Sequence, residues 1–310
     1  MTYRPRIGIA LGSGSARGWA HIGVLECLAE AGIRPDILCG TSIGALVAGP
    51  AAAGELKPLR DWVLELDWQD VLSLLDIGFG GGLIRGARLF DELKKNFADH
   101  RIEHLPRPYG AVATDLARGQ EIWMRSGSLH DAIRASIALP GLFTPVLRDG
   151  RWMVDGGLVN PVPVSLCRAL GADVVIAVDL NSDLLQRRGL GSRREAREAD
   201  DVQNLLAGSR FRNLISATLR EKAEQWKAYF FPDKGTPPSV VDVAAQSVYI
   251  MQVRISRARM AGDPPDVLLT PRLGHIRLIE FHRAAEAIEE GYETARESLP
   301  EIREHIEAYG

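Results

Sequence analysis

Short apolar runs alternate with longer helix-like segments along the first part of the chain. Residues 6–11 (RIGIAL) and 36–40 (DILCG) have the compact apolar character of buried strands. Residues 16–31 and 43–53 follow helical patterns instead, and Gly32 fits a C-cap after the first of these helices. The order strand, helix, strand, helix indicates parallel strands that are joined by helices.

The same alternation continues as far as Leu180. Ser128 and Asp131 are placed to cap a helix that ends near Ala138. We therefore predict an α/β fold of three layers, in which a mostly parallel central sheet carries helices on both faces. Sites in such sheets lie at the carboxyl ends of the strands. The further strands that we expect are residues 110–115, 121–125, 152–155 and 172–180.

Beyond Leu180 the pattern weakens, and we expect residues 6–180 to form the core. Residues 181–310 are expected to add a charged loop and a largely helical extension that packs on the same domain. Within it, residues 186–201 read as a solvated linker or mobile loop. Residues 202–259 are mostly helical in pattern apart from a proline-rich break at 232–238, residues 266–269 form a late strand, and residues 276–299 form an amphipathic helix.

Composition and charge narrow the class of protein. Hydrophobic residues make up 46% of the 310 residues and charged residues 25%, as in ordinary soluble domains, and the net charge of -3 gives no sign of a nucleic-acid partner. Residues 37–54 carry no charge, but glycines and Pro50 interrupt them, so a strand, a turn and a helix explain them better than a membrane span. The first apolar run is too short for a signal peptide, and three cysteines cannot all pair, so we expect a cytoplasmic protein.

The segment Gly40-Thr41-Ser42-Ile43-Gly44 has the Gly-x-Ser-x-Gly pattern of a nucleophile elbow. The pattern is short enough to occur by chance, so the predicted secondary structure around it carries more of the evidence than the pattern itself. Here it joins a predicted strand to a predicted helix, an arrangement that lifts a serine hydroxyl out of the sheet. Ser42 would also lie at a helix N-terminus, whose dipole favours developing negative charge. Ser42 is therefore the candidate nucleophile.

A serine needs a base in contact with it. None of the seven histidines follows a strand in the turn-rich context expected of a triad base. Asp155 ends a predicted strand before Gly156-Gly157, although an aspartate in that position is also typical of a plain turn. An ordinary carboxylate, with a pKa of about 3.9, is a weak base, so a Ser42–Asp155 pair requires burial that raises this pKa.

Residues 12–18 (GSGSARG) follow the first strand and open a helix, so their backbone N–H groups could hold an oxyanion. Arg17 is placed to anchor this loop or to meet a phosphate. The loop also resembles a loose dinucleotide-binding fingerprint. That alternative is weak, because Asp36 opens the second strand instead of ending it.

Four ordered blocks resemble the patatin-like phospholipase family, and in particular its bacterial members related to the neuropathy target esterase catalytic domain. The resemblance implies a patatin-like fold in which Ser42 and Asp155 form a catalytic dyad without histidine, cofactor or metal. The glycine-rich loop would then form the oxyanion hole, with Ser13 where the family often has a glycine. The blocks are GSGSARGWAHIGVL (12–25), GTSIG (40–44), ASIALPGLFTPV (135–146) and DGGLVNPVP (155–163). The implied oxyanion-hole residues are Gly12, Gly14, Ser15, Ala16 and Arg17, with the amides of Gly14, Ser15 and Ala16 as donors, and the motif glycines are Gly18, Gly40, Gly44, Gly156 and Gly157.

The family implies a serine acyl hydrolase that acts on phospholipids, lysophospholipids or other acyl esters through an acyl-enzyme. The expected partner is a lipid or acyl-ester substrate, with peripheral contact at the inner face of a membrane. A homo-oligomer stays open, as does a flap formed by residues 67–85. The alternative function is a non-catalytic lipid-binding or regulatory protein with the same fold, against which the intact Ser42 and Asp155 argue.

Overall fold

The computed structural model describes residues 4–67, 70–71, 87–140, 143–183 and 240–309. The chain divides into one compact unit formed by residues 1–183 and 251–310, and a second formed by residues 184–250. In the second unit only residues 240–250 are described, as the first part of a helix. The predicted charged loop, the helical pattern of 202–239 and nearly all of the expected 67–85 flap lie outside the described residues.

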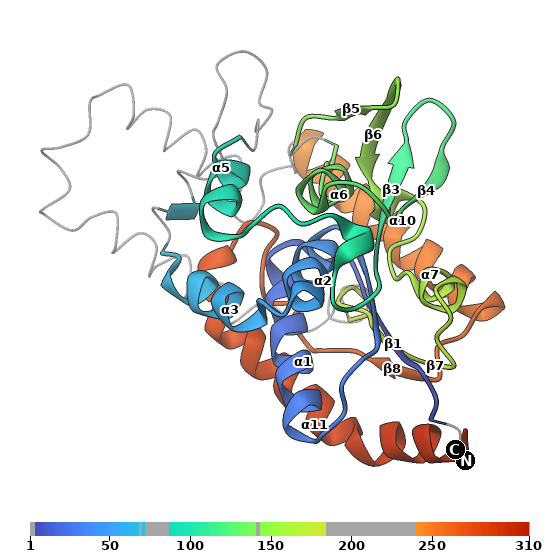
Figure 1. Ribbon diagram of the computed structural model, residues 1–310. Helices are drawn as coiled ribbons and strands as arrows, with labels where there is room; N and C mark the ends of the chain where they lie inside the picture. The colour runs from blue at the N-terminus through green and yellow to red at the C-terminus, as the bar shows by residue number, and fades with distance from the viewer. Residues whose placement is uncertain (1–3, 68–69, 72–86, 141–142, 184–239, 310) are drawn as a thin grey trace, which may run out of the picture. The chain divides into compact units, whose positions relative to one another are not determined.

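Five parallel strands form the centre of the first unit, in the order β3-β2-β1-β7-β8 (Figure 1). All residues of β1, β2, β3 and β7 are buried, as expected of strands covered on both faces. The parallel strands are β1 (Ile7–Leu11), β2 (Ile37–Thr41), β3 (Tyr109–Asp115), β7 (Val174–Val178) and β8 (Val267–Leu269).

Three antiparallel strands extend the sheet at β3, namely β4 (Gln120–Met124), β5 (Val146–Arg148) and β6 (Arg151–Asp155). β2 pairs with the first part of β3 and β6 with its last part, while β4 pairs with residues 111–115 and so overlaps both. Because a strand has only two edges, β2 and β6 must share one edge of β3 and β4 must occupy the other. The carboxyl ends of β2 and β6 therefore meet along β3.

Helices cover both faces of the sheet, and the apolar residues divide into two clusters accordingly. Ile9 and Leu11 of β1 belong to the larger cluster, whereas Ala10 belongs to the smaller one. The larger cluster is built with η1 (Ser15–Trp19), α1 (Ala20–Glu30), α2 (Ile43–Ala53), α3 (Leu56–Glu65), α5 (Ala87–Asn96), α6 (Leu129–Ser136) and α11 (Ala284–Ala308), and the smaller one with α7 (Val164–Ala169). The other helices among the described residues are η2 (Ile102–His104), η3 (Gly156–Leu158), α10 (Val240–Gly262) and η5 (Phe281–Arg283).

The predicted fold class is confirmed, and each expected strand is present within two residues of its predicted ends. The Ser128 hydroxyl accepts from the Asp131 amide, as its predicted capping role requires. The expected C-terminal helix begins later than predicted, at Ala284, and runs on to Ala308. Residues 276–283, which were predicted as its start, lie outside α11. Among them, the Leu278 carbonyl accepts from the Ser15 hydroxyl at 2.6 Å.

Candidate active site

Ser42 occupies the turn between β2 and α2 in a strained backbone conformation, with φ 57° and ψ −125°. The chain packs very tightly around this turn. A Cβ on Gly40 would lie 2.3 Å from the Gly44 carbonyl, and one on Gly44 would lie 2.0 Å from the Leu11 carbonyl oxygen. Both positions therefore need glycine, and the pair of glycines lets Ser42 stand at the carboxyl end of the strand.

Asp155 reaches Ser42 because the two strand ends meet on β3. Thr41, the last residue of β2, pairs with Val112, and Asp155, the last residue of β6, pairs with the adjacent Ala113. Ser42 directly follows Thr41, so its side chain falls beside Asp155. The Ser42 hydroxyl donates to Asp155 Oδ2 across 2.5 Å. The structure thus brings together the two residues that the sequence singled out, 113 positions apart.

The Asp155 carboxylate is fully buried and held from several sides. Its Oδ1 accepts from the Gly157 amide at 2.7 Å. Its own amide donates to the Ala138 carbonyl at 2.9 Å, and its carbonyl accepts from the Thr114 hydroxyl at 2.8 Å. These bonds fix the carboxylate relative to Ser42 and leave it little freedom to turn away.

Burial raises the pKa of Asp155 from 3.8 to about 7, against the opposing hydrogen bonds from Ser42 and Gly157. A carboxylate with this pKa is a far better proton acceptor than one near its ordinary value. The site therefore supplies the condition that a Ser-Asp pair needs to act without histidine.

Ser136 holds the Ser42 turn from the end of α6. Its hydroxyl accepts from the Ser42 amide at 2.9 Å and donates to the Val112 carbonyl at 2.6 Å. It thereby ties the Ser42 turn to β3. Sequence reasoning missed this residue: Ser136 lies in one of the family blocks, but nothing in the spacing distinguishes it from any other buried serine.

The glycine-rich loop lies against the turn that carries Ser42, since a Cβ on Gly18 would lie 2.2 Å from the Ile43 side chain. The amides of Gly12 and Ala16 donate to the carbonyls of Val178 and Leu278, at 3.0 and 3.2 Å. Among the residues that the structure describes, no hydrogen-bond acceptor is found for the amides of Gly14 and Ser15. Of the expected donors, these two are free to hold an anion.

Arg17 is buried and holds the loop in place. Its Nε donates to the Gly14 carbonyl at 3.1 Å and its Nη2 to Asn181 Oδ1 at 3.0 Å. Of the two roles considered for Arg17, these contacts support the anchoring one. Asn181 lies just beyond β7, and no motif of the sequence pointed to it.

Gln252 of α10 fills the space between the glycine-rich loop and the loop after Asp155. Its Oε1 accepts from the Ser13 hydroxyl at 3.3 Å and from Asn181 Nδ2 at 3.4 Å. Its Nε2 packs so closely on Gly157 that a Cβ there would lie 2.5 Å away. Gln252 is 3% exposed, and with 239 positions between it and Ser13 no local pattern could have revealed the contact.

No histidine is hydrogen-bonded to Ser42 or Asp155 within the described part of the chain. His21, the nearest in sequence to the loop, bonds through Nε2 to the Gly12 carbonyl at 2.8 Å. Burial lowers its pKa to about 4, so its ring is neutral at neutral pH. Its position gives it a structural role in the loop.

The described residues contain no group of three or more histidine, cysteine, aspartate or glutamate side chains that could hold a metal ion. None of the described helices is both long and apolar enough to cross a membrane.

A model of the patatin-like phospholipase family matches residues 9–168, which include the glycine-rich loop, Ser42 and Asp155. The chain belongs to this family. Proteins of the NTE family from Mycobacterium tuberculosis and Mycobacterium bovis, named as uncharacterized, are 34% identical to it over 95% of this chain and 91% of theirs.

Two further matches cover nearly all of this chain. Lysophospholipase nte1 of Emericella nidulans is 27% identical over 96% of this chain, which corresponds to 18% of that much longer protein. Among solved structures, VipD from Legionella pneumophila matches with a TM-score of 0.45 and 12% identity, covering 99% of this chain and 67% of that one.

Proposed function

We propose that this protein is a serine acyl hydrolase that cleaves lipid esters, with Ser42 as nucleophile and Asp155 as base. The observation that carries the proposal is the 2.5 Å hydrogen bond from Ser42 to Asp155, whose pKa is raised to about 7. Family membership and the name of the lysophospholipase relative support a lipid ester as substrate.

In the proposed first half-reaction, Ser42 Oγ bonds to the ester carbonyl carbon while its proton passes to Asp155. The amides of Gly14 and Ser15 donate to the oxyanion that forms. The bond from carbon to the alcohol oxygen then breaks, and the leaving alcohol takes the proton from Asp155. Water repeats the sequence on the acyl-enzyme, so that the carboxylic acid leaves and Ser42 recovers its proton.

The deciding experiment is labelling with a fluorophosphonate probe, which reacts with activated serines. We expect wild type to be labelled, folded Ser42→Ala to be unlabelled, and folded Asp155→Asn to be labelled at least about a hundredfold more slowly. Circular dichroism of all three proteins checks that they are folded. Undiminished labelling of folded Ser42→Ala would contradict the assignment of the nucleophile.

The substrate class is tested separately with p-nitrophenyl esters of short and long acyl chains and then with lysophospholipids. We expect kcat/KM to rise with chain length. Hydrolysis without any such preference would contradict a lipid substrate while leaving the esterase intact. A protein that binds lysophospholipid but neither hydrolyses it nor reacts with the probe would be the non-catalytic lipid-binding protein instead.

A further inference from the structure

Three large apolar side chains form an exposed row across the tip of the antiparallel extension. Leu147 of β5 pairs directly with Trp152 of β6, and the Leu116 amide donates to the Trp152 carbonyl at 2.8 Å. Residues opposite one another on neighbouring strands point to the same face. The three side chains are 58%, 52% and 52% exposed for Leu147, Trp152 and Leu116, so the row is apolar surface that solvent reaches.

This row belongs to what we call the hairpin surface: residues 115–120 and 146–152, together with Trp123 and Arg125. Ten large hydrophobic side chains are exposed in the described part of the chain, and four of them lie on this surface. Both of the exposed tryptophans among those ten, Trp123 and Trp152, are included. Such a concentration on two hairpins differs from the scattered exposed hydrophobics of an ordinary surface.

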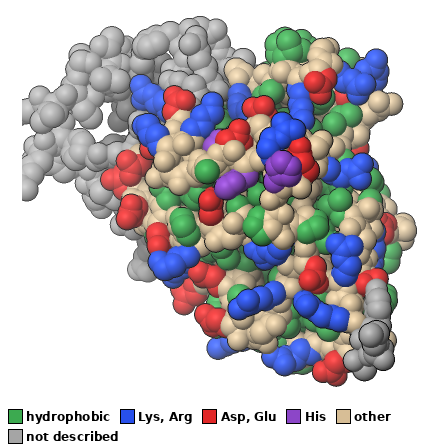
Figure 2. Space-filling model, viewed as in Figure 1, with side chains coloured by type: hydrophobic (Ala, Val, Ile, Leu, Met, Phe, Trp, Pro, Cys, Tyr) green, Lys and Arg blue, Asp and Glu red, His purple; other side chains and the backbone are tan. Residues whose placement is uncertain are grey.

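The hairpin surface is also basic. It carries Arg118, Arg125, Arg148 and Arg151 against Asp115 and Asp149, an excess of two positive charges in a chain whose net charge is -3. Glu121, which accepts from Trp123 Nε1 at 2.6 Å, is neutralised by Arg259 at 2.5 Å. Asp115 is buried and already engaged, because Arg118 lies 3.1 Å and Arg151 4.0 Å from its Oδ2. In Figure 2, hydrophobic and basic side chains lie side by side at the top of the view, over the β5 and β6 tips labelled in Figure 1.

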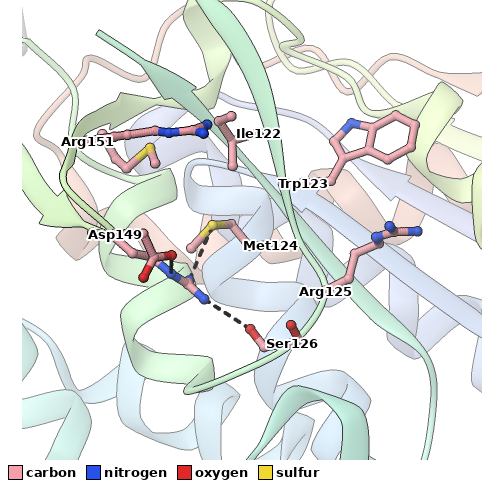
Figure 3. A pocket seen from close by; sticks show the side chains of 9 residues that line it. Ile122, Trp123, Met124, Arg125, Ser126, Asp149 and Arg151 are labelled. Carbon is pink, nitrogen blue, oxygen red and sulfur yellow. Dashed lines mark hydrogen bonds and ion pairs between the residues drawn. The ribbon is translucent and has the colours of Figure 1, made fainter. Parts of the chain in front are cut away.

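A shallow pocket of about 250 Å³ opens on the other face of the same hairpins. Figure 3 shows Arg151 beside the apolar side chain of Ile122. Arg148, which also lines the pocket, donates to the Met124 sulfur at 3.3 Å and to the Ser126 carbonyl at 3.2 Å. On the face of the row, the Arg125 guanidinium lies 5.7 Å from the centre of the Trp123 ring, so apolar side chains lie next to guanidinium groups on both faces of the extension. That combination suits a layer in which anionic phosphates cover hydrocarbon.

The hairpin surface lies close to Asp155 along β6. Trp152 and Asp155 belong to the same strand and are three residues apart, a rise of about 10 Å. Because an odd number of residues separates them, the two side chains point to opposite faces of the sheet, and the hairpin surface would hold a bilayer near the strand end that carries Asp155 without itself forming the candidate site.

We propose that the hairpin surface binds the anionic surface of a lipid bilayer. Trp152, Leu147 and Leu116 enter the headgroup region, and the surrounding arginines contact lipid phosphates. The inference rests on the proposed function, because a bilayer held there would be the source of the lipid ester that Ser42 attacks. It commits to a bilayer as occupant, and free phosphate or a second copy of the chain are the rival occupants.

The test is co-sedimentation of Ser42→Ala protein, which cannot consume the lipid, with vesicles of phosphatidylcholine or of equimolar phosphatidylcholine and phosphatidylglycerol. We expect binding to the anionic vesicles only, weakened by added salt. Leu147→Ser with Trp152→Ser should lower the partition coefficient about tenfold. The double variant Arg118→Gln with Arg151→Gln should lower the partition coefficient about fivefold for each arginine that is removed. Matched controls are Leu268→Ser, also an exposed leucine on a strand, and Arg296→Gln on α11, neither of which should change it.

Equal binding to both kinds of vesicle, or unchanged binding by the two hairpin variants, would overturn the proposal. So would self-association that is lost in Leu147→Ser with Trp152→Ser, or binding that free phosphate displaces. Hydrolysis of a short soluble ester by the hairpin variants in a wild-type Ser42 background separates the two proposals. The hairpin variants should hydrolyse this ester at the wild-type rate. If wild type itself does not hydrolyse it, that result counts against the proposed function alone.

Discussion

At the scale of single residues, the buried Asp155 carboxyl sets how the proposed activity depends on pH. Its pKa is raised to about 7, and only the deprotonated form can take the Ser42 proton. We therefore predict that kcat/KM for a soluble ester rises about tenfold per pH unit below 7 and levels off above it. A pH-stat assay between about pH 5 and pH 9, with circular dichroism to confirm folding, measures the profile. A flat profile across this range in folded protein would be inconsistent with Asp155 as the base.

The same carboxyl makes the folded state less stable as pH rises. Its pKa is about 7 in the folded state against an ordinary 3.8, so the folded protein binds more protons between these two values. The contribution of this group to the free energy of unfolding therefore falls as pH rises from about 4 to 7, and the cost is complete above about 7. Asp155→Asn carries no such charge. We predict that the free energy of unfolding of Asp155→Asn, relative to that of wild type, increases by at least about 1 kcal/mol from pH 4 to pH 8. The shift of the pKa from 3.8 to about 7 allows an increase of at most about 4 kcal/mol.

Urea unfolding of both proteins at the two pH values measures this gain. Asp149→Asn is the control, because Asp149 is an exposed aspartate in the turn between β5 and β6 whose replacement changes the net charge equally. If Asp155→Asn and wild type keep the same difference in stability at both pH values, burial does not raise the pKa of Asp155 as described.

The two residues at the centre of the candidate site could be predicted from the sequence because each stands in a local pattern. Ser42 lies between glycines after an apolar strand, and Asp155 precedes two glycines at the end of another. Ser136 and Gln252 could not be predicted in this way. Ser136 lies 94 positions after its partner Ser42, and Gln252 lies 239 positions after its partner Ser13. Their roles depend on packing between distant segments, which periodicity does not encode.

At the scale of elements, the strands themselves were predictable but the meeting of β2 and β6 was not. Both are short apolar runs before glycines. That they abut on one edge of β3 follows only from the registers Thr41 with Val112 and Asp155 with Ala113. A one-residue slip in either register would turn the affected side chain to the other face of the sheet. Register between distant strands is a property of the assembled sheet.

α10 is the element whose role in the site invites a direct test. Gln252 lies between Ser13 and Gly157 and so separates the proposed oxyanion-binding loop from the loop after Asp155. We predict that Gln252→Ala lowers kcat for a soluble ester on the order of tenfold with little change in KM, because the donors lose their alignment without loss of substrate contacts. Met251→Ala is the matched control, since Met251 precedes it on the same helix and is 48% exposed.

Steady-state kinetics of the three proteins separates these outcomes. Gln252→Glu, which keeps the shape and the acceptor oxygen, should recover part of the lost kcat. An increase in KM without a fall in kcat would assign Gln252 to substrate binding instead of to the position of the loop.

At the scale of the whole first unit, the fold needs more of the chain than the family match covers. The match ends at residue 168, before β7, β8 and α11. Yet β7 pairs with the full length of β1, and α11 contributes Ile288, Ala295 and Ile302 to the larger apolar cluster. The sequence pattern weakened beyond Leu180, and the next strand that the structure describes, β8, begins only at Val267. Amphipathicity alone did not show which surface the last helix would cover.

α11 packs on α1 so closely that the backbones nearly touch, which makes the contact sensitive to one methyl group. A Cβ on Gly291 would lie 2.0 Å from the Ala20 carbonyl oxygen, an atom that cannot move without shifting α1. We predict that Gly291→Ala lowers the free energy of unfolding by about 1–3 kcal/mol despite the higher helix propensity of alanine. Gly262→Ala in α10 is the matched control, since nothing lies within 4 Å of its added Cβ. Denaturant unfolding that gives both variants wild-type stability would mean that α1 and α11 do not pack this closely in solution.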